Sequence, residues 1–109
     1  MPNRPGPYIP QDIEELLDHL TLMMSIAPHF KDETGYFPDR NADREFFVLH
    51  EGLLVIRQQI GEARYSKLIA LSDDMRKRFE EARVAEKNPA SLNAGLRIAV
   101  EMEQLLKEI

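Results

Sequence analysis

Apolar residues recur at helical spacing in four segments of this chain of 109 residues. They predict helices over about 12–27, 42–60, 62–87 and 90–109, because apolar positions three and four residues apart fall on one face of an α-helix. Alternation with a period of two never extends beyond a few residues, and no Asn-Gly or Asp-Gly pair offers a hairpin turn. The pattern therefore predicts an all-α fold, most simply a four-helix bundle.

Polar residues and glycine mark where these helices begin and end. Asp12 is a candidate N-cap of the first helix, with Glu15 three residues later in an approximate capping box. Asn41 or Asp43 can cap the second helix. Gly61 predicts a left-handed C-cap and a very short turn, which would make the second and third helices an antiparallel hairpin. One continuous helix bent at Gly61 is the alternative, since glycine costs only ~1 kcal/mol inside a helix.

The segment Lys31–Asp43 is the one long interruption between predicted helices. Extended, the connection from the first helix to the second reaches ~45 Å, which exceeds the ~28 Å length of the second helix. The first two helices can therefore be antiparallel or parallel. Residues 1–10 contain four prolines and predict an extended tail, and residues 11–109 predict a single helical domain.

Charge and composition narrow the classes of partner and the compartment. Acidic residues number 19 against 14 basic ones, which gives a net charge of −5 and argues against binding nucleic acid or an anionic membrane surface. The chain has no cysteine, so it forms no disulfide and no thiolate site. The first ten residues lack the apolar core of a signal peptide. These features together predict a cytoplasmic protein.

Candidate metal and catalytic motifs are incomplete. Residues 39–43 follow the D-x-N-x-D start of a calcium loop, but Arg44 stands where that loop needs glycine and His50 where it needs glutamate. No H-E-x-x-H motif and no Glu-x-x-His pair is present. No nucleophile elbow or glycine-rich phosphate loop occurs either. We therefore expect no metal, no cofactor and no catalytic residue.

The outer face of the second predicted helix carries two unexplained apolar residues. Phe47 and Leu54 lie one heptad apart, on the face that also carries His50 and Arg57. Such a line resembles a docking surface, because aromatic residues and arginine are enriched at interface centres. The expectation favoured here is that the proline-rich tail or the two aromatic residues of the long loop fold over this line. If they do not, the candidate partner-binding residues are Tyr36, Phe37, Phe47, His50, Leu54 and Arg57.

These features favour a small non-enzymatic protein-interaction module, of the adaptor, antitoxin or immunity-like kind, that binds another protein or itself. Its acidic surface would suit a basic partner. Two alternatives stay open. One is a structural homodimer without a heterologous partner, and the other is a small-ligand or metal-dependent enzyme.

Overall fold

The structure is a computed structural model that describes residues 7–30, 41–84 and 89–109. Within these ranges it consists of α-helices and turns without any strand, which confirms the all-α prediction. None of the described helices is long and apolar enough to cross a membrane. The helices are α1 (Ile13–Ile26), α2 (Ala42–Val55), α3 (Arg57–Ile60), α4 (Glu62–Val84) and α5 (Pro89–Lys107).

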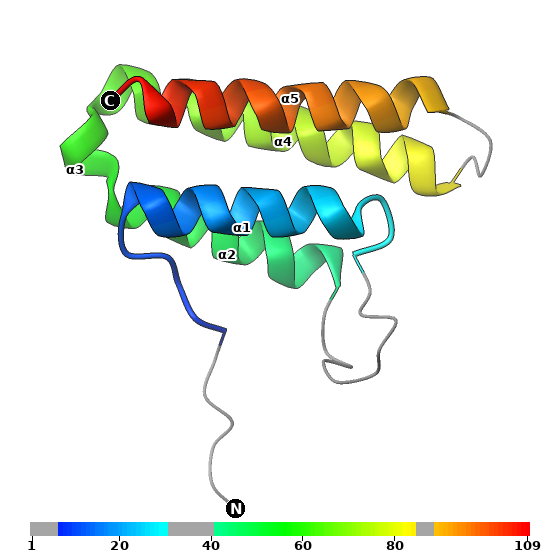
Figure 1. Ribbon diagram of the computed structural model, residues 1–109, viewed down its shortest axis with the longest axis horizontal. Helices are drawn as coiled ribbons and strands as arrows, with labels where there is room; N and C mark the ends of the chain where they lie inside the picture. The colour runs from blue at the N-terminus through cyan, green and yellow to red at the C-terminus, as the bar shows by residue number, and fades with distance from the viewer. Residues whose placement is uncertain (1–6, 31–40, 85–88) are drawn as a thin grey trace, which may run out of the picture.

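The four long helices lie in two layers (Figure 1). One layer holds α1 and α2, and the other holds α4 and α5. Each long helix packs on two neighbours: α1 on α2 and α5, and α4 on α2 and α5. Figure 1 shows that α1 and α2 run in opposite directions, which decides between the antiparallel and parallel arrangements that the sequence left open.

The N-termini of α1 and α2 are capped as their sequences predict. The Asp12 carboxylate accepts a hydrogen bond from the backbone N–H of Glu15 at 2.8 Å, and the Asn41 side chain accepts one from Arg44 at 2.9 Å. The Glu15 carboxylate in turn accepts from the backbone N–H of Gln11 at 2.7 Å, one residue before the cap. Because Asn41 is the cap, Asp43 lies inside α2 rather than in the loop. The rest of the predicted loop, residues 31–40, lies outside the described residues.

The predicted helix over 42–60 is wrong in one respect, because it divides at Ile56 into α2 and the single-turn helix α3. Helix α3 crosses from the layer of α1 and α2 to the layer of α4 and α5 (Figure 1). Because the helix divides there, Ile56 and Ile60 both stay buried where the chain passes from one layer of helices to the other. It also explains why the described part of the chain has five helices where four were predicted.

Gly61 separates α3 from α4 and has φ +88° and ψ 158°. The positive φ agrees with the predicted glycine C-cap, but the extended ψ belongs to a region that only glycine occupies readily. Because Gly61 is not helical, the alternative of one continuous helix through this position is wrong. The second and third predicted helices therefore do not form a direct hairpin, because α3 lies between α2 and α4.

The core contains an aromatic residue that the helical pattern did not reveal. Phe30 follows the last turn of α1 with φ +56° and is only 1% exposed. Its ring packs edge-on against Phe46 of α2 and Phe79 of α4, with centroids 5.6 Å and 5.4 Å apart. Phe30 thus closes the end of the core where α1 stops.

Candidate functional site

The outer face of α2 carries three exposed apolar side chains. Phe47 is 53% exposed, Leu54 47% and Val55 47%. Phe47 and Leu54 lie almost one above the other along the helix, since seven residues make nearly two turns. We call Phe47, Leu54 and Val55 the α2 ridge. About half of each of these two side chains meets solvent. Whether the tail or the two aromatic residues of the long loop also contact them stays a prediction, because residues 1–6 and 31–40 lie outside the described residues.

The other sides of α2 are held in place, which fixes the direction of the ridge. Phe46, Leu49 and Leu53 are buried in the core. On a second side Gly52 packs closely, because a Cβ placed there would lie 2.7 Å from the side chain of Leu16 and 3.2 Å from Pro10. Glycine at this position therefore lets α1 and the N-terminal segment approach α2. The ridge stands on a helix that is anchored from two directions.

A line of polar contacts joins α2 and α3 to α4, next to the ridge. His50 is part of it: its Nε2 lies 2.7 Å from Oγ of Ser72 and 3.7 Å from the carboxylate of Asp73. About two turns before His50 on α2, Asp43 accepts a hydrogen bond from Arg76 of α4. His50 therefore packs against α4 rather than standing free beside the ridge.

Arg57, another predicted partner-binding residue, is also engaged within the chain. Its guanidinium donates to both carboxylate oxygens of Glu62, at 2.5 Å and 2.8 Å, and lies 4.6 Å from the ring centroid of Tyr65. The hydrogen bonds that Arg57 donates to the Glu62 carboxylate lower the pKa of Glu62 and raise the pKa of Arg57. Arg57 thus fastens α3 to the start of α4 across Gly61.

The four predicted partner-binding residues that the structure describes therefore do not form one group. Phe47 and Leu54 belong to the exposed ridge, while His50 and Arg57 belong to the polar contacts behind it. Tyr36 and Phe37 lie outside the described residues. Val55, which the sequence analysis did not single out, is the last residue of α2 and joins the ridge because 47% of it is exposed.

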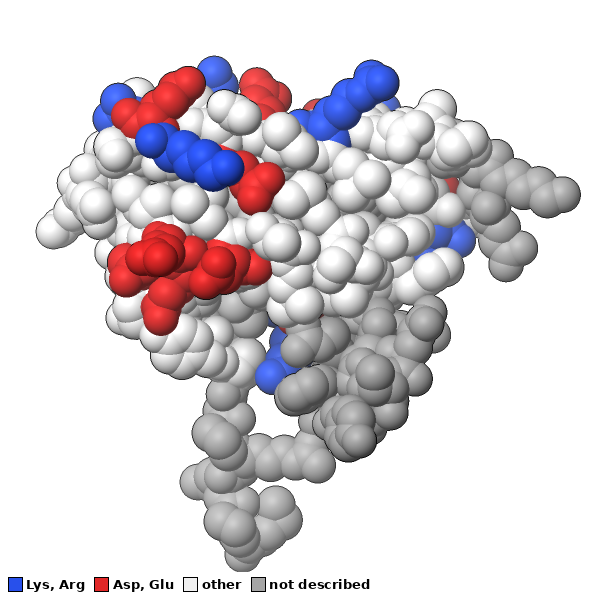
Figure 2. All heavy atoms as spheres, viewed as in Figure 1, with Lys and Arg blue, Asp and Glu red and all other residues white. Residues whose placement is uncertain are grey.

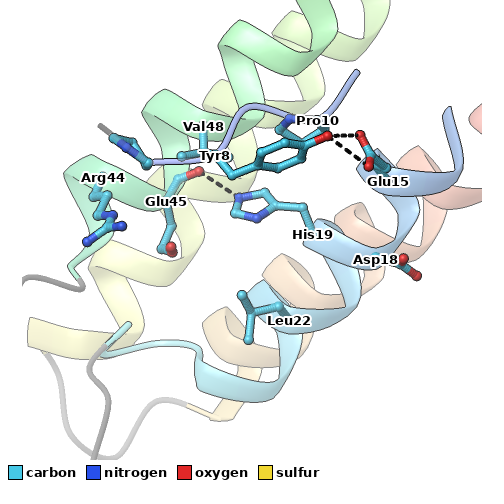
Figure 3. Close-up of a pocket in the computed structure, with 10 residues that line it drawn as sticks. Tyr8, Pro10, Glu15, Asp18, His19, Leu22, Arg44, Glu45 and Val48 are labelled. Carbon is cyan, nitrogen blue, oxygen red and sulfur yellow. Dashed lines mark hydrogen bonds between the residues drawn. The ribbon is translucent and has the colours of Figure 1, made fainter. Parts of the chain in front are cut away.

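A second surface feature is a cavity of about 400 Å³ between α1, α2 and the N-terminal segment. Figure 3 shows His19 between the ring of Tyr8 and the side chain of Leu22, with Arg44 and Glu45 on the facing wall. His19 Nε2 lies 3.0 Å from the backbone oxygen of Glu45 and so links α1 to α2. The sequence analysis missed this cavity, because its walls come from three separate segments.

Glu15 holds the N-terminal segment over one end of the cavity. Both of its carboxylate oxygens accept from the hydroxyl of Tyr8, at 2.8 Å and 2.9 Å. This hydrogen bond to a carboxylate raises the pKa of Tyr8. The hydroxyl group of the exposed Tyr8 is therefore fastened to α1, which supplies the acceptor.

Acidic side chains gather over the first half of α1 (Figure 2). Asp12, Glu14, Glu15 and Asp18 follow one another closely there. Beside them, over the second half of α1 and the adjoining part of α5, Figure 2 shows a broad area without charged side chains. The acidic character of this part of α1 extends to the mouth of the cavity, since Glu15 and Asp18 both line it.

Neither metal chemistry nor a relative supplies a role for these surfaces. Among the described residues, no group of three or more His, Asp or Glu side chains is placed to hold a metal ion. Comparison with protein families, with characterised proteins and with solved structures finds no match.

Proposed function

We propose that this chain is a small non-enzymatic protein-interaction module, built on a four-helix bundle, that docks another protein on the α2 ridge. The observation that carries the proposal is the half-exposure of Phe47 and Leu54 on an anchored helix. Aromatic and leucine side chains that stay in water lose favourable free energy, at roughly 25 cal/mol for each Å² of apolar surface. A partner that covers them recovers this free energy without rearranging the core.

The size of the ridge indicates what the partner must also contact. Three half-exposed side chains offer on the order of 300 Å² of apolar surface, taking ~200 Å² for a whole aromatic side chain. Stable interfaces bury ~800 Å² on each partner. The partner therefore extends onto the polar rim, where Glu51 is half-buried and Gln58 exposed. A partner with basic residues matches both Glu51 and the net charge of −5.

Among the described residues, the pair of His50 and Ser72 comes closest to a catalytic arrangement, but its position supports a role in binding over one in catalysis. His50 and Ser72 form a hydrogen bond of the length found between a base and a nucleophile. Ser72, however, is fully buried between α2 and α4, so a substrate could not reach its hydroxyl. We assign this pair to the packing of α4 against α2.

The proposal is tested by capturing partners from the native lysate with the wild-type chain and with Leu54→Asp as bait. Val100→Asp is the matched control, because Val100 is 45% exposed on α5, away from the ridge. We expect a partner that the wild type and Val100→Asp retain and Leu54→Asp loses. Recovery of the same proteins by all three baits, or of none by any, would contradict the proposal.

The second candidate is a homodimer in which the ridge meets a second copy. Light scattering at about 100 μM tests this candidate, since the dissociation constant of a structural dimer lies well below that concentration. A dimer that Leu54→Asp dissociates and Val100→Asp preserves would favour this candidate. A monomer at that concentration would exclude it and leave the heterologous partner.

A further inference from the structure

We propose that the cavity between α1, α2 and the N-terminal segment binds a small organic cation, namely a primary amine or guanidinium on a short apolar body. This site is separate from the α2 ridge and does not depend on the proposed function. Its volume of about 400 Å³ falls within the range of small-molecule sites, which is ~300–1,000 Å³. Its lining joins apolar walls to a few polar groups, as such sites commonly do.

His19 provides the directional group. The backbone oxygen of Glu45 can only accept a hydrogen bond, so the Nε2 of His19 that lies 3.0 Å away must carry the proton. Nδ1 of the neutral ring is then a free acceptor, and it has no partner among the described residues. The ring is half-buried and its orientation is set by the bond to α2. A ligand N–H group can therefore donate to Nδ1 without moving the ring.

The charges around His19 select the sign of the ligand. Among the described residues that line the cavity, Glu15 and Asp18 of α1 and Glu45 of α2 are acidic, and Arg44 is basic. Asp18 is exposed and forms no ion pair in the part of the chain that the structure describes. An ammonium or guanidinium group at His19 meets this acidic wall favourably, whereas a carboxylate would meet repulsion.

The apolar walls define the rest of the ligand. Leu22 and Val48 face the cavity from α1 and α2, and Pro10 and the ring of Tyr8 close its other end. Leu22 is 36% exposed and has apolar surface that a ligand could cover. These walls accommodate a single ring or a short alkyl chain. A polyamine without apolar surface would leave them in water.

The test uses three probes that share one ring: benzylamine, benzyl alcohol and phenylacetate. Backbone amide NMR follows their binding to the full chain. We expect benzylamine to shift the amides of residues 18, 19, 22 and 48, benzyl alcohol to shift them more weakly, and phenylacetate to leave them unchanged. Equal binding of phenylacetate and benzylamine, or no shift at these residues with any probe, would overturn the proposal.

Two variants locate the contacts. Asp18→Asn should weaken the binding of benzylamine by about twofold to fivefold, which is the range for an exposed charge pair. Glu14→Gln is the matched control, since Glu14 is an exposed acid of the same helix that does not line the cavity, and it should leave binding unchanged. Equal weakening by both variants would show only a general attraction to an acidic surface and would overturn the proposal. The comparison of the three probes uses only the wild-type chain, so it does not depend on whether either variant folds.

Discussion

Replacing Phe30 by alanine should reduce the free energy of unfolding by about 3–5 kcal/mol. Phe30 is 1% exposed, so the substitution removes a fully buried ring and leaves a cavity. Its edge-on contacts with Phe46 and Phe79 are lost as well, and each such contact stabilises by ~0.5–1.5 kcal/mol. The left-handed backbone at φ +56° is retained by alanine, so its cost is not relieved. For a domain whose total stability is ~5–15 kcal/mol, the loss is a large fraction.

Urea unfolding followed by far-ultraviolet circular dichroism measures this change, because the chain is helical and lacks tryptophan. The midpoint should fall while the slope against denaturant stays the same, as expected when only native stability changes. Phe47→Ala is the matched control, since the same side chain is 53% exposed there. We expect it to change stability by no more than ~0.5–1 kcal/mol.

Equal losses from Phe30→Ala and Phe47→Ala would refute this reasoning. Such a result would mean that Phe47 is buried in the protein in solution, by a second copy or by another segment of the chain. The comparison therefore tests the α2 ridge at the same time as the core. A large loss for Phe30→Ala beside a small one for Phe47→Ala would leave the ridge free for a partner.

Three further substitutions test packing and charge. Gly95→Ala should destabilise the protein by ~1–3 kcal/mol in urea unfolding, because a Cβ there would lie 2.5 Å from the buried ring of Phe79 on α4. An unchanged midpoint of unfolding would contradict this, since it would show that the ring moves aside freely. Ser72→Ala should cost ~1 kcal/mol in the same assay, because it removes the buried hydroxyl that bonds His50, and a gain in stability would contradict that assignment. Because Arg57 lowers the pKa of Glu62, the stabilisation from their pair is present above the unfolded-state pKa of Glu62 and disappears as the pH falls through the lower folded-state value. The difference in stability between the wild type and Glu62→Gln should therefore shrink on acidification, and a difference independent of pH would contradict it.

Local patterns in the sequence were sufficient for the helices and their caps. Spacing of apolar residues located all four long helices, because each helix must bury one face. Asp12 and Asn41 were recognisable as caps, since a side-chain oxygen before a helix satisfies a free backbone N–H. The division at Ile56 was not recognisable, because it contains neither glycine nor proline. It follows from the need to cross between two layers of helices.

The candidate site likewise contains features that the sequence predicts and features that it does not. The sequence placed Phe47 and Leu54 on one outer line of α2, since their seven-residue spacing depends only on helix geometry. It also placed His50 and Arg57 beside them, but only packing against α4 showed that both are bonded within the chain. Glu15 and His19 lie four residues apart on α1, so their spacing alone would pair them on one face of the helix. The structure instead joins Glu15 to Tyr8 and His19 to α2.

The sequence alone was therefore enough to predict the helical class, the long helices and the line of Phe47 and Leu54, because each of these depends on contacts within a few residues. Only the packed helices reveal the burial of Phe30, the antiparallel order of α1 and α2, and the cavity around His19. Each of these joins segments that are distant along the chain. Helical periodicity specifies which face of a helix is apolar, but the partner of that face is set by how all the helices pack together.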